Sequence, residues 1–315
     1  MKLTIGSRGS KLALWQATWV RDQLAAAGHE VGIRIIKTTG DKLQTIAPDA
    51  PLPASMAQTV AEVGTKGLFI KEIEEALLEC EVDVAVHSLK DLPTVQPDGL
   101  VLGAVPERED ARDVFIARGH RPLANQPSGA RVATSSPRRQ SQLRTLRPDL
   151  TYFAMRGNLD TRLRKLAGGE GDALVLAAAG IHRLGLSEHI TSYFTFDEVC
   201  PAVGQGALGI EIRAGDAVAE AVAGLDHRAT HCAVRAERAV LLRLGGGCQV
   251  PIAAHAVWED KQMRLRGLVA NLDGTQVIRA QAVGSPADPE TLGAAVADDL
   301  LRAGARAILD PLDKA

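Results

Sequence analysis

Short runs of β-branched residues alternate with amphipathic stretches through the first two-thirds of the chain. Alternating apolar positions predict strands, and apolar positions spaced three and four residues apart predict helices. The predicted strands are 3–7, 31–37, 82–87, 131–134, 150–155 and 173–178. The predicted helices start after Ser10, cover 68–80, start after Ser136, and cover 158–166. This alternation is typical of an α/β protein.

The α/β pattern repeats weakly. The segment Asp83-Val-Ala-Val-His-Ser resembles Asp172-Ala-Leu-Val-Leu-Ala, which predicts two related halves that face each other across a cleft. Residues 203–212 predict a glycine-punctuated strand that returns to the first half. The pattern breaks between Lys42 and Gly64, where three prolines lie among small and polar residues. A loop of this length inside a compact domain predicts a mobile lid.

The pattern changes after Asp226. A helix is predicted at 232–244, and a second one at 289–303. Between them the strands 252–258, 263–270 and 276–283 are predicted, and Asp273-Gly274 is a hairpin signal between the last two. The C-terminal part is therefore predicted to be a small α+β domain with a three-stranded antiparallel sheet.

Composition limits the class of protein. A chain of 315 residues with 46% apolar and 23% charged residues is typical of a globular protein with two or three domains. No apolar run approaches the ~18 residues that a membrane span needs. The start of the chain lacks the apolar region of a secretory signal. The four cysteines form no CxxC pair, which favours a reducing cytosol over disulfides or a zinc ribbon.

Charge is distributed unevenly. The net charge of −2, with only 3% aromatic residues, disfavours a nucleic-acid binder. From Arg131 to Lys165, however, nine basic residues face two acidic ones. This segment predicts a site of positive potential, and the alternative is a solvated helix face. His227 and His231 have the spacing of a helical zinc site, but residue 228 is arginine instead of glutamate, so we expect no metal.

Cys248 lies in a segment that favours exposure of its thiol. Three glycines precede it in Gly245-Gly246-Gly247-Cys248-Gln249-Val250-Pro251, and the proline prevents a central strand from continuing. The pattern is typical of an attachment point or a nucleophile. The alternative is a small buried apolar residue, which is the usual role of a free cysteine.

Serine and arginine side chains cluster where predicted strands lead into helices. These residues are Arg8 and Ser10 at the first junction, Ser136, Arg138 and Arg139 at another, and Arg156 and Arg162 at a third. Helix N-termini bind anions, and arginine adds a bidentate fork, so the set predicts a ligand with several anionic groups. For any single arginine, a surface salt bridge is the alternative.

Asp91 follows Lys90 at the end of a predicted strand, which is where catalytic groups of α/β proteins commonly lie. A carboxylate in a basic site could donate a proton and then stabilise a cation. Its alternative role is to cap a loop. His87, just before it, is predicted to be a packing residue and not a catalytic base.

Ordered blocks of the sequence resemble the porphobilinogen deaminases, also called hydroxymethylbilane synthases. The blocks are Ser7–Gln16, Lys66–Phe69, Val86–Pro93, Thr134–Gln140, Arg156–Asn158, Pro201–Ala207 and Gly246–Pro251. The last part of the chain resembles the family only in its general pattern. The stretch before Lys66 is longer and richer in proline than the family pattern, and the glycine run before Cys248 has one additional glycine.

The resemblance implies three domains. The first covers 1–106 and 207–224 and contains the catalytic aspartate and a mobile lid at about 42–65. The second covers 112–200 and contains the arginine-rich anion site, and the third covers 228–315 and carries the cysteine. The first two domains are implied to have the type II periplasmic-binding-protein fold.

The resemblance also implies the chemistry. Cys248 would hold a dipyrromethane cofactor through a thioether, onto which four porphobilinogen molecules are condensed head to tail with release of ammonia. The product is the linear tetrapyrrole hydroxymethylbilane, an intermediate of heme biosynthesis. Asp91 matches the catalytic aspartate of the family, where it acts as general acid and base.

The remaining site residues are carried over by motif. Those implied to bind the cofactor are Cys248, Arg138, Arg139, Ser136, Lys90, Ser88 and Arg183. Those implied to bind substrate are Arg8, Ser10, Arg156, Arg162 and Gln205. Acetate and propionate arms on every pyrrole make the ligand a polyanion, which agrees with the arginine-rich junctions. We expect a cytoplasmic monomer that binds neither nucleic acid nor membrane; a non-catalytic, two-lobed anion-binding protein is the alternative.

Overall fold

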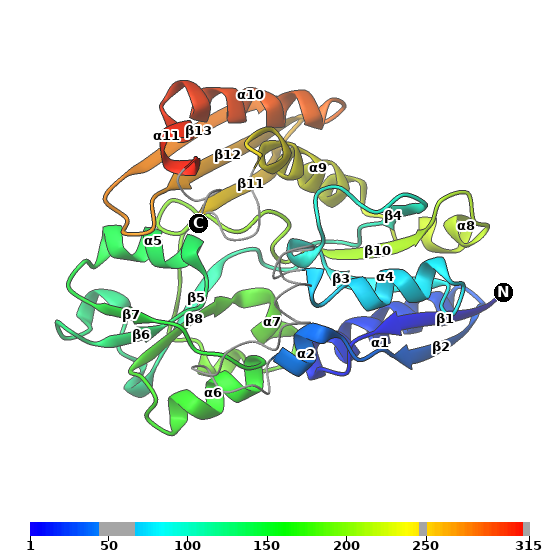
Figure 1. The fold of residues 1–315 in the computed structure, drawn as a ribbon, viewed down its shortest axis with the longest axis horizontal. Helices are drawn as coiled ribbons and strands as arrows, with labels where there is room; N and C mark the ends of the chain where they lie inside the picture. Colours follow the sequence, from blue (N-terminus) through cyan, green and yellow to red (C-terminus); the bar gives the residue numbers. More distant parts are fainter. Residues whose placement is uncertain (44–66, 246–250, 311–315) are drawn as a thin grey trace. The chain divides into compact units, whose positions relative to one another are not determined.

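The computed structural model describes residues 1–43, 67–245 and 251–310 (Figure 1). The chain divides into two compact units, which are described separately. The first unit contains 1–108 and 207–231, and the second contains 109–206 and 232–315. The predicted lid falls almost entirely on 44–66, and Cys248 falls on 246–250, so both predictions lie outside the described residues.

The first unit is built on a five-stranded sheet with the order β2-β1-β3-β10-β4. Its strands are β1 (Lys2–Ser7), β2 (Glu30–Ile35), β3 (Val84–Ser88), β4 (Leu100–Ala104) and β10 (Leu208–Arg213). Strands β2, β1 and β3 are parallel, and β10 runs antiparallel to both of its neighbours. The helices are α1 (Lys11–Ala26), α2 (Thr39–Leu43), α4 (Lys71–Leu78), the 3₁₀ helix η1 (Leu89–Asp91) and α8 (Val218–Ala223).

The second unit contains two sheets. The five-stranded sheet has the order β7-β6-β8-β5-β9, and the antiparallel sheet has the order β11-β12-β13. The strands are β5 (Asp113–Ala117), β6 (Arg131–Ala133), β7 (Thr151–Phe153), β8 (Ala173–Ala177), β9 (Ser192–Tyr193), β11 (Ile252–Glu259), β12 (Gln262–Ala270) and β13 (Val277–Gly284). The helices are α5 (Pro137–Leu146), α6 (Leu159–Ala167), α7 (Ala178–Arg183), α9 (Arg228–Arg243), which begins in the first unit, α10 (Pro289–Arg302) and α11 (Ala305–Leu309), with short 3₁₀ turns at Arg118–His120, Leu123–Asn125 and Ser187–His189.

The two five-stranded sheets have the same topology. In each, the first parallel strand lies between the second and third, and a strand distant in sequence is inserted antiparallel next to the third. The side chains of Asp83 and Asp172, at the starts of β3 and β8, each accept a backbone N–H from the first strand at 2.8 Å. Arg213 pairs with Asp83, and Arg118 pairs with Asp172, in the same relative places. The predicted internal repeat is therefore confirmed.

The C-terminal sheet buries one face under helices. Apolar residues of β11 and β12 pack on α9, α10 and α11. The ribbon in Figure 1 shows α10 running along this sheet. Gly267 permits close packing, because a Cβ there would lie 2.7 Å from Val296. The hairpin between β12 and β13 contacts α5, where Thr145 donates a hydrogen bond to the Gly274 carbonyl at 3.2 Å. A Cβ on Gly274 would lie 2.4 Å from the carbonyl oxygen of Ser141.

The predicted fold class is confirmed, with two α/β domains and a small α+β domain that has a three-stranded antiparallel sheet. The three-domain limits remain a prediction, because compactness separates only two units. The strand predicted at 203–212 begins only at Leu208, since Gly204 and Gly206 have φ angles of 70° and 87°, outside the range of strands. The helix predicted at 232–244 begins earlier, at Arg228.

A buried acidic side chain lies in the first unit. Glu74, on α4, is 9% exposed, and its Oε1 has no hydrogen-bond partner among the described residues. Burial raises the pKa of Glu74 to about 7, and the charges of Glu211 and Glu75 act in the same direction while His87 opposes them. Below about pH 7, the folded protein therefore keeps the Glu74 carboxyl protonated.

We expect Glu74→Gln to remove a pH dependence of stability. An unfolded glutamate ionises near pH 4.5, so the contribution of Glu74 to stability is highest below that pH and is lost as the pH rises through about 7. The loss amounts to about 3 kcal/mol, and glutamine does not suffer it. The measurement is thermal unfolding at pH 5 and at pH 8. Relative to the wild type, the variant should be clearly more stable at pH 8 than at pH 5. Glu79→Gln, at the exposed end of the same helix, is the control; an equal gain there would contradict the assignment.

Candidate active site

The predicted site residues of the first unit follow β1 and β3, at the carboxyl ends of parallel strands. Ser10 is the N-cap of α1, and its hydroxyl accepts the backbone N–H of Ala13 at 3.3 Å. Arg8 donates from Nε to Asp41 at 3.1 Å, and its guanidinium lies 4.3 Å from the centre of the Phe69 ring. Arg8 is therefore held in place by an acid and by an aromatic ring.

The segment after β3 carries three more predicted residues. Ser88 ends the strand, and its hydroxyl accepts a hydrogen bond from Gln16 at 2.9 Å. Lys90 and Asp91 lie in the 3₁₀ helix η1 that follows. Asp91 is partly exposed, and its carboxylate has no hydrogen-bond or ion-pair partner among the described residues. Within the described part of the chain, its side chain therefore does not cap a loop.

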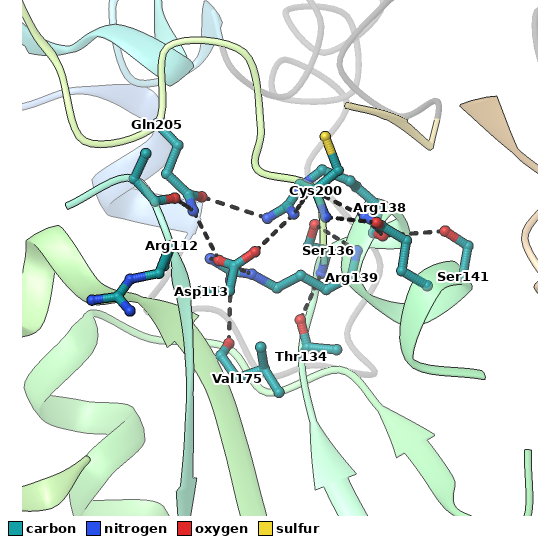
Figure 2. A network of polar contacts seen from close by, with 12 residues as sticks. Arg112, Asp113, Thr134, Ser136, Arg138, Arg139, Ser141, Val175, Cys200 and Gln205 are labelled. Atoms are coloured by element: carbon teal, nitrogen blue, oxygen red, sulfur yellow. Dashed lines mark hydrogen bonds and ion pairs between the residues drawn. The ribbon is translucent and has the colours of Figure 1, made fainter. Parts of the chain in front are cut away.

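In the second unit, Asp113 at the start of β5 joins the predicted arginines into one network (Figure 2). Arg138 donates to Asp113 Oδ2 at 2.7 Å and to the Cys200 carbonyl at 2.6 Å. Arg139 donates to Asp113 Oδ1 from Nε at 2.9 Å and from Nη2 at 2.7 Å, and to the Val175 carbonyl at 3.2 Å. One carboxylate therefore fixes two adjacent guanidinium groups.

Electrostatics favour the charged form of Asp113. Burial alone would raise the pKa of Asp113, but the charges and hydrogen bonds of Arg138 and Arg139 lower it to about 2. All three side chains are buried: the two arginines are 5% and 7% exposed, and Asp113 is 0% exposed. Within the described residues, the two guanidinium groups share this one carboxylate.

Gln205 and Ser136 belong to the same network. The Gln205 amide donates to Asp113 at 3.0 Å and to the Ala111 carbonyl at 2.7 Å, and its oxygen accepts from Arg138 at 3.5 Å. Ser136 is the N-cap of α5 and accepts the Arg139 backbone N–H at 3.4 Å. Gln205 is fully buried, so it supports the arginines and is not open to solvent.

Two further predicted arginines are partly buried. The Arg162 guanidinium donates to the Gly157 carbonyl at 2.8 Å, its only hydrogen-bond partner among the described residues. Burial, together with the like charge of Arg139, lowers the pKa of Arg162 to about 10. Burial also lowers the pKa of Arg183 to about 10, although Glu109 opposes the effect, and Arg183 donates to the Gly206 carbonyl at 2.7 Å. An anion near Arg162 would offset the unfavourable burial of its charge.

Arg156 differs from the other predicted arginines. It is exposed, and it has no hydrogen-bond or ion-pair partner within the described parts of the chain. It follows β7, two residues before the N-cap of α6. The structure therefore places Ser136, Arg138, Arg139 and Gln205 in one network and does not link Arg156 to it.

The basic segment 131–165 is better neutralised than its local sequence suggests. Arg147 pairs with Asp149 at 2.7 Å, and Lys165 pairs with Glu170 at 3.3 Å. Asp113, which neutralises part of the charge of two more arginines, lies outside the segment. Sequence reasoning missed Asp113, and its only local signal is an acid at the start of an apolar strand.

Other candidate groups have structural roles. Cys200 is buried, and burial raises the pKa of its thiol to about 12, which disfavours a nucleophilic thiolate. His87 is buried and bonded to Glu211, as expected of a packing residue. Within the described residues, no group of three or more His, Cys, Asp or Glu side chains is placed to hold a metal ion. Over the same residues, no helix is long and apolar enough to cross a membrane.

Fold and site together define a mixed α/β protein in which one buried carboxylate holds a pair of arginines. Residues 3–221 match the family model "Porphobilinogen deaminase, dipyromethane cofactor binding domain", and residues 231–302 match "Porphobilinogen deaminase, C-terminal domain". Porphobilinogen deaminase of Syntrophobacter fumaroxidans is 48% identical over 99% of this chain and 98% of its own length. That of Geobacter sulfurreducens is 49% identical over 98% and 94%. The chain belongs to the porphobilinogen deaminase family.

The chain is therefore a transferase of tetrapyrrole biosynthesis, which condenses porphobilinogen into hydroxymethylbilane and uses a dipyrromethane cofactor. These predictions are confirmed, and the alternative of a non-catalytic anion-binding protein is wrong. Among solved structures, the methionine-binding protein MetQ is similar at a TM-score of 0.44 and 11% identity, over 71% of this chain and 88% of that one. The alkanesulfonate-binding protein SsuA from Xanthomonas axonopodis is similar at 0.36 and 16%, over 76% and 74%. Likeness at this level does not bear on the ligand.

Proposed function

We propose that the cofactor is attached to Cys248 through a thioether, that Asp91 is the catalytic acid and base, and that the predicted arginines hold the carboxylates of the growing chain. The observation that carries the proposal is the Asp113 network. It presents Arg138 and Arg139 as a pair of guanidinium groups held by one carboxylate. Arg162 lies close enough for the charge of Arg139 to lower its pKa.

The residues present suit a dipyrromethane. When bound, that group supplies a pyrrole carbon that attacks the next substrate, and its acetate and propionate arms are anionic. Arg162 has guanidinium N–H groups that meet no acid among the described residues, and its burial makes an anionic partner favourable. Arginine forks bind carboxylates bidentately, which fixes orientation as well as charge. Lys90, Ser88 and Arg183 would complete the cofactor contacts.

Asp91 has a position that suits proton transfer. Each condensation forms one carbon–carbon bond and releases one ammonia, so a proton must reach the departing amine and another must leave the pyrrole carbon that has reacted. A carboxyl group can give the first proton and, as a carboxylate, accept the second. Between these steps its negative charge would stabilise the cationic pyrrole unit. The partial exposure of Asp91, and its lack of a side-chain partner among the described residues, support this role.

For the substrate, Arg8, Ser10, Arg156, Arg162 and Gln205 are the proposed contacts. Arg156 is the exposed member of this set, and Arg8 is already paired with Asp41. Gln205 would act through Arg138, to which it is bonded. We also propose a cytoplasmic monomer that binds no nucleic acid, which the net charge of −2 and the absence of a CxxC pair support.

Intact-mass measurement tests the attachment. The purified chain should exceed its sequence mass by two pyrrole units, and Cys248→Ser should have the sequence mass alone, because an alcohol side chain does not form the thioether. Cys232→Ser is the matched control and should retain the additional mass. If Cys248→Ser also retained it, the proposed attachment would be wrong.

A further inference from the structure

A single buried carboxylate contacts both ends of the segment that carries Asp91. Glu211, in β10, is hydrogen-bonded through Oε2 to His87 Nε2 at 3.1 Å. Its other oxygen, Oε1, accepts a hydrogen bond from the Gln96 side chain at 2.9 Å. His87 is the residue before Ser88, and Gln96 lies just after the turn that follows Asp91. Lys90 and Asp91 thus lie between two residues, His87 and Gln96, that are both hydrogen-bonded to Glu211. We call these two hydrogen bonds the ties of the segment.

The sheet register makes this arrangement possible. In the antiparallel pair of β10 and β3, Gly209 is opposite His87 and Glu211 is opposite Ala85, so all four lie on one face. The Leu89 backbone N–H donates to the Ala207 carbonyl at 3.0 Å, which adds a contact at the start of the segment. The side chains of Glu211 and His87 are 0% and 4% exposed, respectively.

Burial of the Glu211 carboxylate is energetically unfavourable. A buried carboxylate loses its hydration, and apolar residues of similar volume commonly give equal or greater stability. Glu211 also faces Glu74, whose carboxyl adds a like charge when it ionises. Stability alone therefore explains the Glu211 carboxylate poorly, whereas a need to fix the geometry of the segment explains both of its hydrogen bonds.

We propose that Glu211 is a positioning residue, which holds the segment 88–95 at its two ends through His87 and Gln96 and so fixes the carboxylate of Asp91. The inference rests on the proposed catalytic role of Asp91. A misplacement of about 1 Å in a reacting group can lower a rate by about 100-fold. Removing one of the two hydrogen bonds to Glu211 should therefore lower kcat more than it changes KM.

The test uses Gln96→Ala, which removes one tie and leaves the buried His87–Glu211 pair intact. Gln23→Ala, on the exposed face of α1, is the matched control. We expect kcat to fall about tenfold to 100-fold in Gln96→Ala, with KM within about twofold and the cofactor mass retained. Amides 88–95 should exchange hydrogen faster than in the control, while the rest of the first unit should exchange as before.

Glu211→Gln is the second variant, because glutamine keeps the shape and one acceptor oxygen. Its kcat should lie between those of the wild type and Gln96→Ala, with faster exchange in the same amides. Unchanged exchange at 88–95 in both variants, or a kcat in both within twofold of the Gln23→Ala control, would overturn the proposal. Asp91→Asn separates the two ideas: if that variant is active, the role of Asp91 fails, while the exchange data still report on the ties.

Discussion

Asp91→Asn should fold, retain its cofactor and lose about 10³-fold of its turnover. The amide has nearly the same shape as the carboxyl group, but it can neither deliver a proton to the departing amine nor accept one from the pyrrole carbon. General acid–base groups contribute about 10²- to 10⁴-fold, and the lost negative charge would add to the effect. Because Asp91 has no protein partner among the described residues, its replacement should disturb little else.

The measurement is the initial rate of hydroxymethylbilane formation under saturating porphobilinogen, with intact mass to show that the cofactor is present. Asp98→Asn is a suitable control, since Asp98 is exposed and lies shortly after the same segment. The control should have wild-type activity. A rate for Asp91→Asn within tenfold of the wild type would remove Asp91 from its proposed role.

Asp113→Asn should be strongly destabilised and should contain little cofactor. The substitution leaves Arg138 and Arg139 buried side by side without their carboxylate. Removing one partner of a buried ion pair costs about 3–5 kcal/mol. The guanidinium groups would also lose the hydrogen bonds that orient them, so the cofactor carboxylates would meet a disordered pair of charges.

Thermal unfolding and intact mass measure the two effects. Asp149→Asn removes the partner of Arg147 in a more exposed ion pair and should destabilise the protein much less than Asp113→Asn does. Adding Arg138→Leu to Asp113→Asn should restore part of the stability, because one unpaired buried charge is removed, but not the cofactor. Wild-type thermal stability in Asp113→Asn would contradict the proposed network.

The pKa of Asp113 predicts the behaviour in acid. Its folded-state pKa of about 2 lies below the ordinary value of 3.8, so its stabilising effect is present above that value and is lost as the pH falls through 2. The difference in stability between the wild type and Asp113→Asn should therefore shrink as the pH falls from 3.8 to about 2.

The sequence predicts those parts of the site that depend on local geometry. Ser10 and Ser136 were expected to cap helices, and both do so, because an N-cap bond joins residues three apart. The repeated strand that begins at Asp83 and Asp172 was also visible, since both copies keep an acid before an apolar run.

Contacts between distant residues could not be predicted in this way. Asp113 reaches Arg138 across 25 positions and Gln205 across 92, and no local pattern signals either pairing. The short strands β5 and β9 were missed for a related reason, because their pairing partners, and not their own periodicity, define them. Glu211 and His87 are 124 positions apart, so their pairing was equally hidden.

The absent side chain at Gly274 has an effect beyond its hairpin. The bare backbone there touches the carbonyl of Ser141, and Ser141 lies on the helix that carries Arg138 and Arg139. Any larger residue would have to push the tip of the C-terminal sheet away from that helix. A substitution at this hairpin tip would in this way disturb the helix that carries Arg138 and Arg139, and its effect would resemble the loss of these arginines.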